Sequence, residues 1–257
     1  MNSKSKKISV IVPAFNEGPS IQKTLKVLTN YLCKKDFESE VIIVNDGSKD
    51  DTVVKAKKFQ CTNVRVVTYG MNMGKGFALR TGFEHSTGDI IAFFDAGLDY
   101  DPSHIDFFLK YMEKYDADVV IGSKRHPQSK VNYPLKRKII SSFAQLIVKI
   151  LFNLNIRDTQ AGLKVFKREV LEKVVPRALV RRYMIDVELL SIAHYYGFKI
   201  IEAPIELNFN FKTTSVTAKA LWWCGIDVLS IFYRLRILKF YQKSEKERER
   251  ILRKRRK

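Results

Sequence analysis

Short apolar runs alternate with amphipathic stretches along the first half of the chain, and each apolar run ends in polar residues. A run without strict alternation, such as 90–94, is typical of a strand that is covered on both faces. Strands are predicted at 7–15, 39–46, 64–70, 89–96 and 117–124, and helices at 18–35, 49–60, 74–86 and 103–115. This order predicts the α/β class, with a Rossmann-like, doubly wound, mostly parallel sheet whose strands all have their carboxyl ends along one edge.

The regular alternation ends after Lys124. A helix is predicted at 139–154, a short strand and a helix within 157–174, a helix at 184–197, a strand at 198–209 and an amphipathic helix at 220–241. The two long apolar segments do not predict membrane spans. Lys149 interrupts the first, and Asp227 and three cations interrupt the second.

The chain carries 46 Lys and Arg against 27 Asp and Glu, a formal net charge of +19. Part of this excess lies in 242–257, so we expect a basic tail there, behind a catalytic domain at 1–215 and an amphipathic appendage at 216–241. Nucleic acid, an anionic membrane surface and a phosphate-rich substrate all fit such a charge. The sequence has no helix-turn-helix signature and no stacking-aromatic motif, so nucleic acid is not favoured as a partner.

Cysteine use and the N-terminus predict a cytoplasmic location. Cys33, Cys61 and Cys224 lie far apart and match neither a disulfide framework nor a metal-ligand spacing. The first ten residues are basic but have no apolar signal core.

Polar side chains follow the predicted strands at the edge where their carboxyl ends meet. Asp95 comes directly after a buried run, and Asp99 and Asp101 come soon after it. Asp101 with Pro102 fits a helix cap. Asp95 and Asp99 either belong to the same capped turn or hold a divalent cation through oxygen ligands. With the Asp, Asn and Lys side chains after the other strands, this edge suits a nucleoside diphosphate and a divalent cation.

Four stretches in order, VIVPAFNE, VIIVNDGSKDDT, NMGKGFALRTGFEHSTGDIIAFFDA and IRDTQAGLKVFKRE, resemble the successive motifs of family 2 glycosyltransferases, which have the GT-A fold. Within this family the chain is similar to the polyprenyl-phosphate glycosyltransferases, such as dolichyl-phosphate β-glucosyltransferase and dolichol-phosphate mannose synthase. RDTQAGLKVFKRE and MIDVELL favour the glucosyltransferase branch. The resemblance implies an inverting enzyme that moves a hexose from a UDP-glucose or GDP-mannose type donor to a polyprenyl or dolichyl phosphate at the cytoplasmic membrane face.

The resemblance also implies which residues bind the donor and the metal. Asp95 would open the family's D-x-D motif and, with Asp99, bind Mg²⁺ or Mn²⁺. The motif's second Asp is Gly97 here, so weaker metal binding, metal-independent activity or an inactive relative stays open. The nucleotide sugar would be held by Pro13, Ala14, Phe15, Glu17, Val44, Asp46, Lys75, Asp95, Ala96 and Gly97. The acceptor and its phosphate would be held by Lys124, Arg125, Arg137 and Gln160.

Catalytic roles are expected for Asp95, Asp99, Asp158 and Asp186. A lipid phosphate is already anionic near neutral pH and needs little help from a general base. Asp158, Asp186 and Glu188 would then orient groups, whereas a glycan or other hydroxyl acceptor, the alternative reading, needs one of them as a base. For Asp186 and Glu188, the polar face of a packed helix is an equally weighted alternative.

The 139–154 and 220–241 helices suit a lipid acceptor. Trp222, Trp223, Phe232 and Tyr233 fit a membrane interface, and Arg234, Arg236, Lys239 and the basic tail would meet anionic headgroups. We therefore expect peripheral attachment to the membrane. A core helix or a dimer contact is the alternative, which leaves a homo-oligomer or a membrane-protein partner open.

Overall fold

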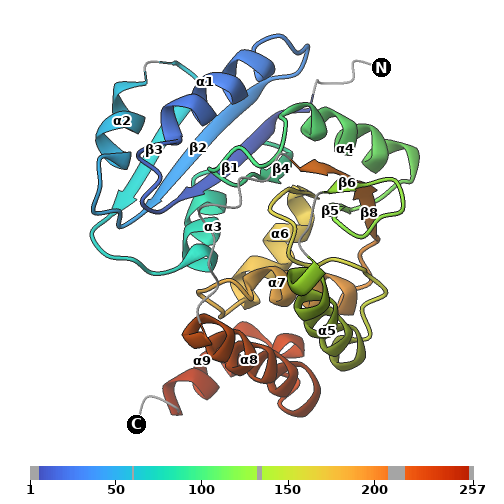
Figure 1. The fold of residues 1–257 in the computed structure, drawn as a ribbon. Helices are drawn as coiled ribbons and strands as arrows, with labels where there is room; N and C mark the ends of the chain where they lie inside the picture. The colour runs from blue at the N-terminus through green and yellow to red at the C-terminus, as the bar shows by residue number, and fades with distance from the viewer. Residues whose placement is uncertain (1–5, 60, 132–134, 208–217, 255–257) are drawn as a thin grey trace, which may run out of the picture.

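The computed structural model describes residues 6–59, 61–131, 135–207 and 218–254, without the side chains of 135–141, 143, 218, 219 and 254. A seven-stranded sheet forms its centre (Figure 1), in the order β3-β2-β1-β4-β7-β5-β8. The strands are β1 (Ile8–Ala14), β2 (Ser39–Asp46), β3 (Val64–Tyr69), β4 (Ile90–Phe93), β5 (Val119–Ser123), β7 (Lys164–Lys167) and β8 (Ile200–Pro204). The predicted α/β class and mostly parallel sheet are confirmed.

β7 runs antiparallel to both of its neighbours, β4 and β5. The expectation that all strands end along one edge is therefore wrong for this strand. Lys164, the first residue of β7, pairs in register with Phe93 near the end of β4 and with Ile121 of β5. The reversed strand thus brings its first residue to the edge where β4 and β5 end.

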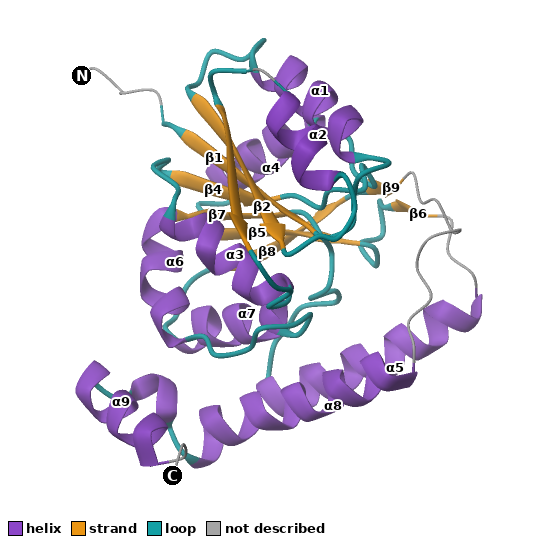
Figure 2. Cartoon of the chain, turned by 90° about the vertical axis from the view of Figure 1, so that its left-hand side faces the viewer, coloured by secondary structure: helices purple, strands orange, loops and turns teal. Residues whose placement is uncertain are grey.

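Helices cover both faces of the sheet and form a separate apolar core on each. One core contains residues of α1 (Ile21–Leu32), α2 (Thr52–Lys58) and α4 (Ser103–Lys114). The other contains residues of α3 (Lys75–Glu84), α6 (Arg168–Val174) and α7 (Ile185–Tyr195), and the short helix η1 (Val175–Arg177) follows α6. The two layers are visible on opposite sides of the strands in Figure 2. The buried strands have few polar positions because both faces are covered.

The C-terminal region packs beneath the second core. α5 (Leu135–Phe152) and α8 (Ala218–Phe232) contact each other and run side by side (Figure 2). One helix was expected at 220–241, but α8 ends at Phe232. The chain continues as a π-helix (Tyr233–Ile237) and a 3-10 helix (Phe240–Gln242), and α9 (Glu245–Lys254) follows. Phe240 and Tyr241 are buried, so the chain turns back onto the core there.

Three further observations complete the fold. The strand expected at 198–209 is split into β8 and β9 (Glu206–Leu207), and β9 pairs with β6 (Lys130–Val131) in a small second sheet. Cys33, Cys61 and Cys224 are free. In the described part of the chain, no helix combines the length and the apolar character that crossing a bilayer requires.

Candidate active site

Asp95 lies just beyond the end of β4 and forms an ion pair with Lys75, the first residue of α3. The Lys75 Nζ lies 3.0 Å from Asp95 Oδ1 and 3.8 Å from Asp186 Oδ2. Burial would lower the pKa of Lys75, but Asp95 and Asp186 outweigh it and raise that pKa. Burial raises the pKa of Asp95, but the positive charge of Lys75 and its hydrogen bond outweigh this, so that pKa lies below its ordinary value. Both groups are therefore charged, and the predicted donor residues Lys75 and Asp95 are brought together.

Lys164 extends this pair into a buried network of alternating charge. Its Nζ lies 2.9 Å from Asp186 Oδ1 and also donates a hydrogen bond to the Ala161 carbonyl. Burial lowers the pKa of Lys164, and Asp186 only partly offsets this. Asp186 thus has one oxygen facing each lysine. A buried carboxylate between two ammonium groups is held in one orientation, which suits positioning of the residues around it.

Gly162 makes room for the Asp95 carboxylate. A Cβ at position 162 would lie 1.7 Å from Asp95 Oδ2, which no real side chain can occupy. The Gly162 N–H donates to the buried Tyr100 hydroxyl at 2.8 Å, which fixes this backbone. Only glycine at 162 leaves the Asp95 carboxylate in its present position.

Asp99 and Asp95 are close enough to affect each other. Burial, followed by the charges of Asp95 and Glu17, raises the pKa of Asp99, and Lys124 opposes the rise. A cation between the carboxylates would relieve this repulsion. Among the described residues no three His, Cys, Asp or Glu side chains group as a complete metal site. A bound Mg²⁺ or Mn²⁺ would therefore take further oxygens from a ligand or water, which these ions accept.

Gly97 lies between the two carboxylates in the sequence, and the space beside it is open. A Cβ at Gly97 would meet Asp99 Oδ2 only at 3.8 Å, an ordinary contact. Ala96, its neighbour, is buried, and its carbonyl accepts a hydrogen bond from the Thr24 hydroxyl at 2.6 Å. The backbone that presents Asp95 and Asp99 is therefore anchored to α1.

Asp46 holds the loop that leads into α3. It accepts hydrogen bonds from the Tyr69 hydroxyl at 2.8 Å and from the Met73 and Gly74 N–H groups at 2.7 and 2.9 Å. The loop is pinned from its other side too, because the Arg181 carbonyl accepts from the Gly76 N–H at 2.7 Å. Asp46 therefore supports Lys75, and its predicted contact with the base or ribose stays a prediction.

The remaining predicted donor residues surround the ends of β1 and β2. Pro13 and Ala14 end β1, and Val44 lies inside β2. Phe15 is 44% exposed, so its ring is available to a ligand. The Glu17 carboxylate accepts from the Ser20 hydroxyl at 2.5 Å.

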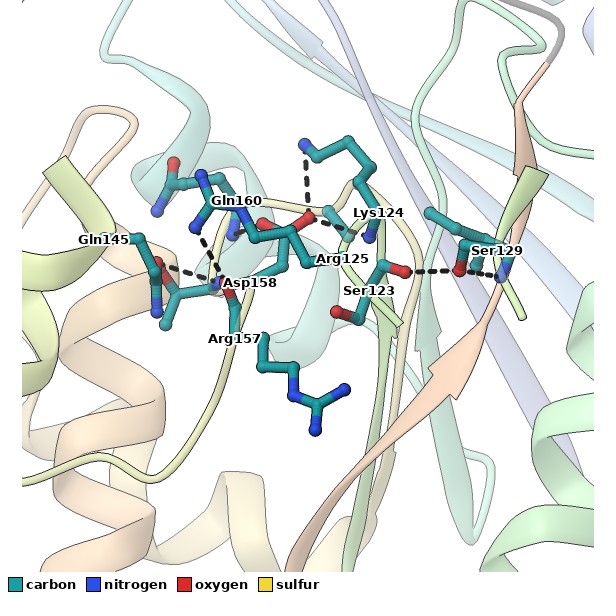
Figure 3. A network of polar contacts seen from close by, with 12 residues as sticks. Ser123, Lys124, Arg125, Ser129, Gln145, Arg157, Asp158 and Gln160 are labelled. Atoms are coloured by element: carbon teal, nitrogen blue, oxygen red, sulfur yellow. Dashed lines mark hydrogen bonds and ion pairs between the residues drawn. The ribbon is translucent and has the colours of Figure 1, made fainter. Parts of the chain in front are cut away.

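Asp158 organises the predicted phosphate-binding residues (Figure 3). Its Oδ2 accepts from the Lys124 N–H at 3.0 Å and lies 3.5 Å from Lys124 Nζ, and its Oδ1 accepts from the Gln160 N–H at 3.0 Å. Arg125 donates to the Arg157 carbonyl at 2.9 Å. These residues come together as predicted, whereas the Arg137 side chain lies outside the described residues.

The side-chain nitrogen of Gln160 is buried and has no hydrogen-bond partner in the described structure. A buried amide without an acceptor is costly and therefore uncommon. A ligand oxygen could satisfy this donor. Gln160 is thus a candidate ligand contact on structural grounds as well.

Glu188 lies away from this cluster. It is fully buried; its Oε2 accepts from the Leu179 and Val180 N–H groups, and its Oε1 from Arg234 at 2.9 Å and the Tyr241 hydroxyl at 2.6 Å. Glu188 therefore ties α7 to the C-terminal segment. The expectation that Arg234 meets headgroups is wrong for this reason, because its guanidinium is paired inside the protein.

A family model described as "Glycosyl transferase family 2" matches residues 9–175. The chain belongs to glycosyltransferase family 2. It is 34% identical over 215 residues to a dolichyl-phosphate beta-glucosyltransferase of Trichomonas vaginalis, covering 78% of this chain and 65% of that protein. It is 33% identical over 253 residues to the Homo sapiens dolichyl-phosphate beta-glucosyltransferase, covering 92% and 78%. The chain thus spans slightly less than two thirds of the first of these relatives.

Solved structures share the fold of this family 2 glycosyltransferase. Glucosyl-3-phosphoglycerate synthase from Mycobacterium tuberculosis, in complex with Mn²⁺, UDP and glucosyl-3-phosphoglycerate, matches with a TM-score of 0.69 and 19% identity, covering 89% of this chain and 79% of that one. The predicted family and the GT-A fold are confirmed by these comparisons, and the relatives named above carry the name of the branch that the sequence favours.

The sequence pattern did not predict three residues that help to build this site: Tyr100, Gly162 and Lys164. Gly162 and Lys164 lie in the quoted stretch IRDTQAGLKVFKRE, so the signal was present. Their contacts depend on the reversed direction of β7, which the pattern of apolar residues does not reveal.

Proposed function

We propose that this family 2 glycosyltransferase moves glucose from a UDP-glucose type donor to a dolichyl or other polyprenyl phosphate at a membrane surface. Relatives that match most of the chain are named dolichyl-phosphate beta-glucosyltransferase, which supports glucose as the sugar and dolichyl phosphate as the acceptor. One observation favours a phosphate acceptor: both carboxylate oxygens of Asp158, and both of Asp186, already bind other groups of the protein.

A general base needs an oxygen that is free to take a proton from the acceptor hydroxyl. Asp186 faces Lys75 and Lys164 with its two oxygens, and Asp158 binds the backbone of Lys124 and of Gln160. Both carboxylates are therefore suited to positioning. A phosphate oxygen attacks without losing a proton, so an acceptor of this kind matches a site whose carboxylates are already bound.

The donor would lie over the residues at the ends of β1, β2 and β4. Asp95 and Asp99 would hold Mg²⁺ or Mn²⁺, which when bound stabilises the charge of the leaving nucleoside diphosphate. Lys75, fixed by Asp95 and Asp186, would meet the diphosphate as a point charge. A single displacement by the phosphate oxygen, from the side opposite the leaving group, would invert the anomeric carbon.

The acceptor's membrane would lie against α5 and α8. Both helices carry large apolar side chains that are exposed: Leu146, Ile147, Ile150, Leu221, Trp222 and Leu229. Exposed cations nearby, such as Arg236 and Lys239, would be attracted to the anionic lipids of a cytoplasmic leaflet. Apolar faces with flanking cations are typical of peripheral attachment.

A transfer assay tests the proposal. The full chain is incubated with UDP-glucose or GDP-mannose, with dolichyl phosphate or a panel of glycans, and with Mg²⁺, Mn²⁺ or a chelator. We expect a glucosylated lipid phosphate from UDP-glucose, formed only with a metal ion. A glycan product with no lipid product would refute the phosphate acceptor and return the role of base to one of the carboxylates.

A further inference from the structure

A cavity of about 550 Å³ lies between α8 and the segment 179–182, and it reaches the loop 72–74 before α3. Arg181 and Arg182 line one side of it, and Asp227 and Arg234 line the other. Asp227 is the only carboxylate among the described residues of the lining, against the guanidinium groups of Arg181 and Arg182, since Arg234 is already paired with Glu188. The cavity is therefore suited to an anion.

Arg182 is held in place by an aromatic ring. Its guanidinium carbon lies 4.0 Å from the centroid of the Trp223 ring on α8. Stacking of this kind fixes the plane of the guanidinium and leaves the N–H groups at its edges free. Those edges match the oxygens of a phosphate in a bidentate contact. In the described part of the chain neither Arg181 nor Arg182 has an acidic partner within ion-pair distance.

Of the two acidic side chains near the cavity, Glu188 is already engaged by other partners. Arg234 uses its Nε and one Nη to bind Tyr241 and Glu188, and Glu188 is fully buried. Burial raises the pKa of Asp227 and Glu188 raises it further, although Arg182 and Arg234 oppose the rise. Asp227 therefore remains the one carboxylate of the lining, opposite Arg181 and Arg182.

We propose that this cavity binds the phosphate group of an anionic bilayer lipid, through Arg181 and Arg182. The proposal rests on the membrane association proposed above. Arg181 and Arg182 are exposed, and Trp223 beside Arg182 is itself 36% exposed next to the exposed Trp222, so a bilayer against this end of α8 would place headgroups beside the arginines. The site is separate from the cations Lys124 and Arg125 that we assign to the acceptor phosphate.

An occupied cavity would also support the catalytic edge. The Arg181 carbonyl accepts hydrogen bonds from the Gly76 and Phe77 N–H groups, at 2.7 and 3.2 Å, at the start of the helix that carries Lys75. A Cβ at Gly74 would lie 2.4 Å from the same carbonyl, which shows how closely the two segments approach. A lipid phosphate held by the Arg181 side chain would therefore restrain the segment on which Lys75 depends.

Vesicle binding of the full chain tests this site. Sedimentation is measured with phosphatidylcholine vesicles that contain phosphatidate, phosphatidylserine at equal surface charge, or dolichyl phosphate alone. The variants are Arg181→Ala/Arg182→Ala, Arg182→Lys and, as a control that removes the same charge from exposed residues outside the cavity, Arg236→Ala/Lys239→Ala. Unfolding curves show whether each variant is folded.

We expect the Arg181→Ala/Arg182→Ala variant to lose about tenfold in affinity for phosphatidate vesicles, and clearly more than the control. Arg182→Lys should lose affinity although its charge is unchanged, because lysine lacks the planar fork. Glycerol 3-phosphate should raise the unfolding temperature of the wild type and not that of the double variant.

Other outcomes overturn the assignment. Equal losses in the two double variants would mean that only diffuse attraction acts. A loss confined to dolichyl phosphate vesicles would assign the arginines to the acceptor, and a loss of nucleoside diphosphate affinity would assign them to the donor. A wild type that binds no vesicles would remove the membrane association itself, whereas the transfer assay above reports on the glucosyltransferase proposal separately.

Discussion

The Glu188 carboxylate of α7 binds the Arg234 guanidinium of the π-helix at 2.9 Å, and it also accepts hydrogen bonds from the N–H groups of Leu179 and Val180. One buried side chain thus connects the C-terminal segment to the backbone just before Arg181. We expect Arg234→Met to lower the free energy of unfolding by about 3–5 kcal/mol, because it leaves a buried carboxylate without its cation.

Chemical denaturation measures this loss. Arg253→Met is the matched control, because Arg253 pairs with Glu249 at 3.5 Å on the exposed side of α9 and such pairs contribute little. An Arg234→Met variant that unfolds at the same denaturant concentration as the wild type would show that Glu188 is satisfied without the guanidinium.

Gly162→Ala is expected to abolish most of the transfer activity. The added Cβ would lie 1.7 Å from Asp95 Oδ2, so the carboxylate must leave its present position beside Lys75. A misplaced metal or diphosphate ligand typically costs about 100-fold in rate. Gly225→Ala is the control, since a Cβ there meets nothing within 4 Å. Calorimetry of Mn²⁺-dependent UDP binding should show the same contrast, and equal binding by both variants would contradict it.

Asp99 and Asp101 are two residues apart and have different roles. Asp99→Asn should weaken Mn²⁺ binding by about 10-fold or more, because one of the two proposed carboxylate ligands, Asp95 and Asp99, is replaced by a neutral amide. Asp101 accepts the Ser103 N–H at 2.8 Å at the start of α4, so Asp101→Asn should leave Mn²⁺ binding unchanged. Titration with Mn²⁺ by electron paramagnetic resonance distinguishes them. Equal effects of the two substitutions would mean that Asp99 is no ligand.

Glu40 should make the protein sensitive to acid. Burial raises its pKa, but hydrogen bonds from Ser9 and Thr87 outweigh this, so the pKa lies below its ordinary value of 4.5. A carboxyl whose pKa is lowered by folding stabilises the protein above its unfolded pKa and loses this contribution as pH falls through the folded pKa.

Glu40→Gln should therefore flatten the fall of the unfolding free energy below about pH 4.5. Denaturation at a series of pH values measures it, with Glu113→Gln on exposed α4 surface as the control. A slope identical to that of the wild type would show that Glu40 keeps its ordinary pKa in the folded protein.

The sequence was most informative where the decisive contacts are local. The position of Asp95 and Asp99 at the end of β4 could be predicted because a buried apolar run ends just before them, and the hydrogen bond of Asp101 at the start of α4 because Pro102 follows it. Arg234 was misassigned because its partner, Glu188, lies 46 residues away and pairs with it only after the chain turns back.

Lys164 was missed for a related reason. Its stretch, LKVFK, predicts a short strand in either direction, and only pairing with β4 and β5 shows that β7 is reversed. The break of the C-terminal helix after Phe232 depends on burial of Phe240 and Tyr241, which again is set by distant residues.

The place of β7 also sets the order in which the domain can assemble. β5 has β7 and β8 as its neighbours and does not pair with β4. A nascent chain that has emerged only as far as β5 can therefore pair β1, β2, β3 and β4. Its β5 has no strand to pair with until β7, about forty residues later, has been synthesised. Ribosome-stalled chains ending before and after β7 should differ sharply in their resistance to protease.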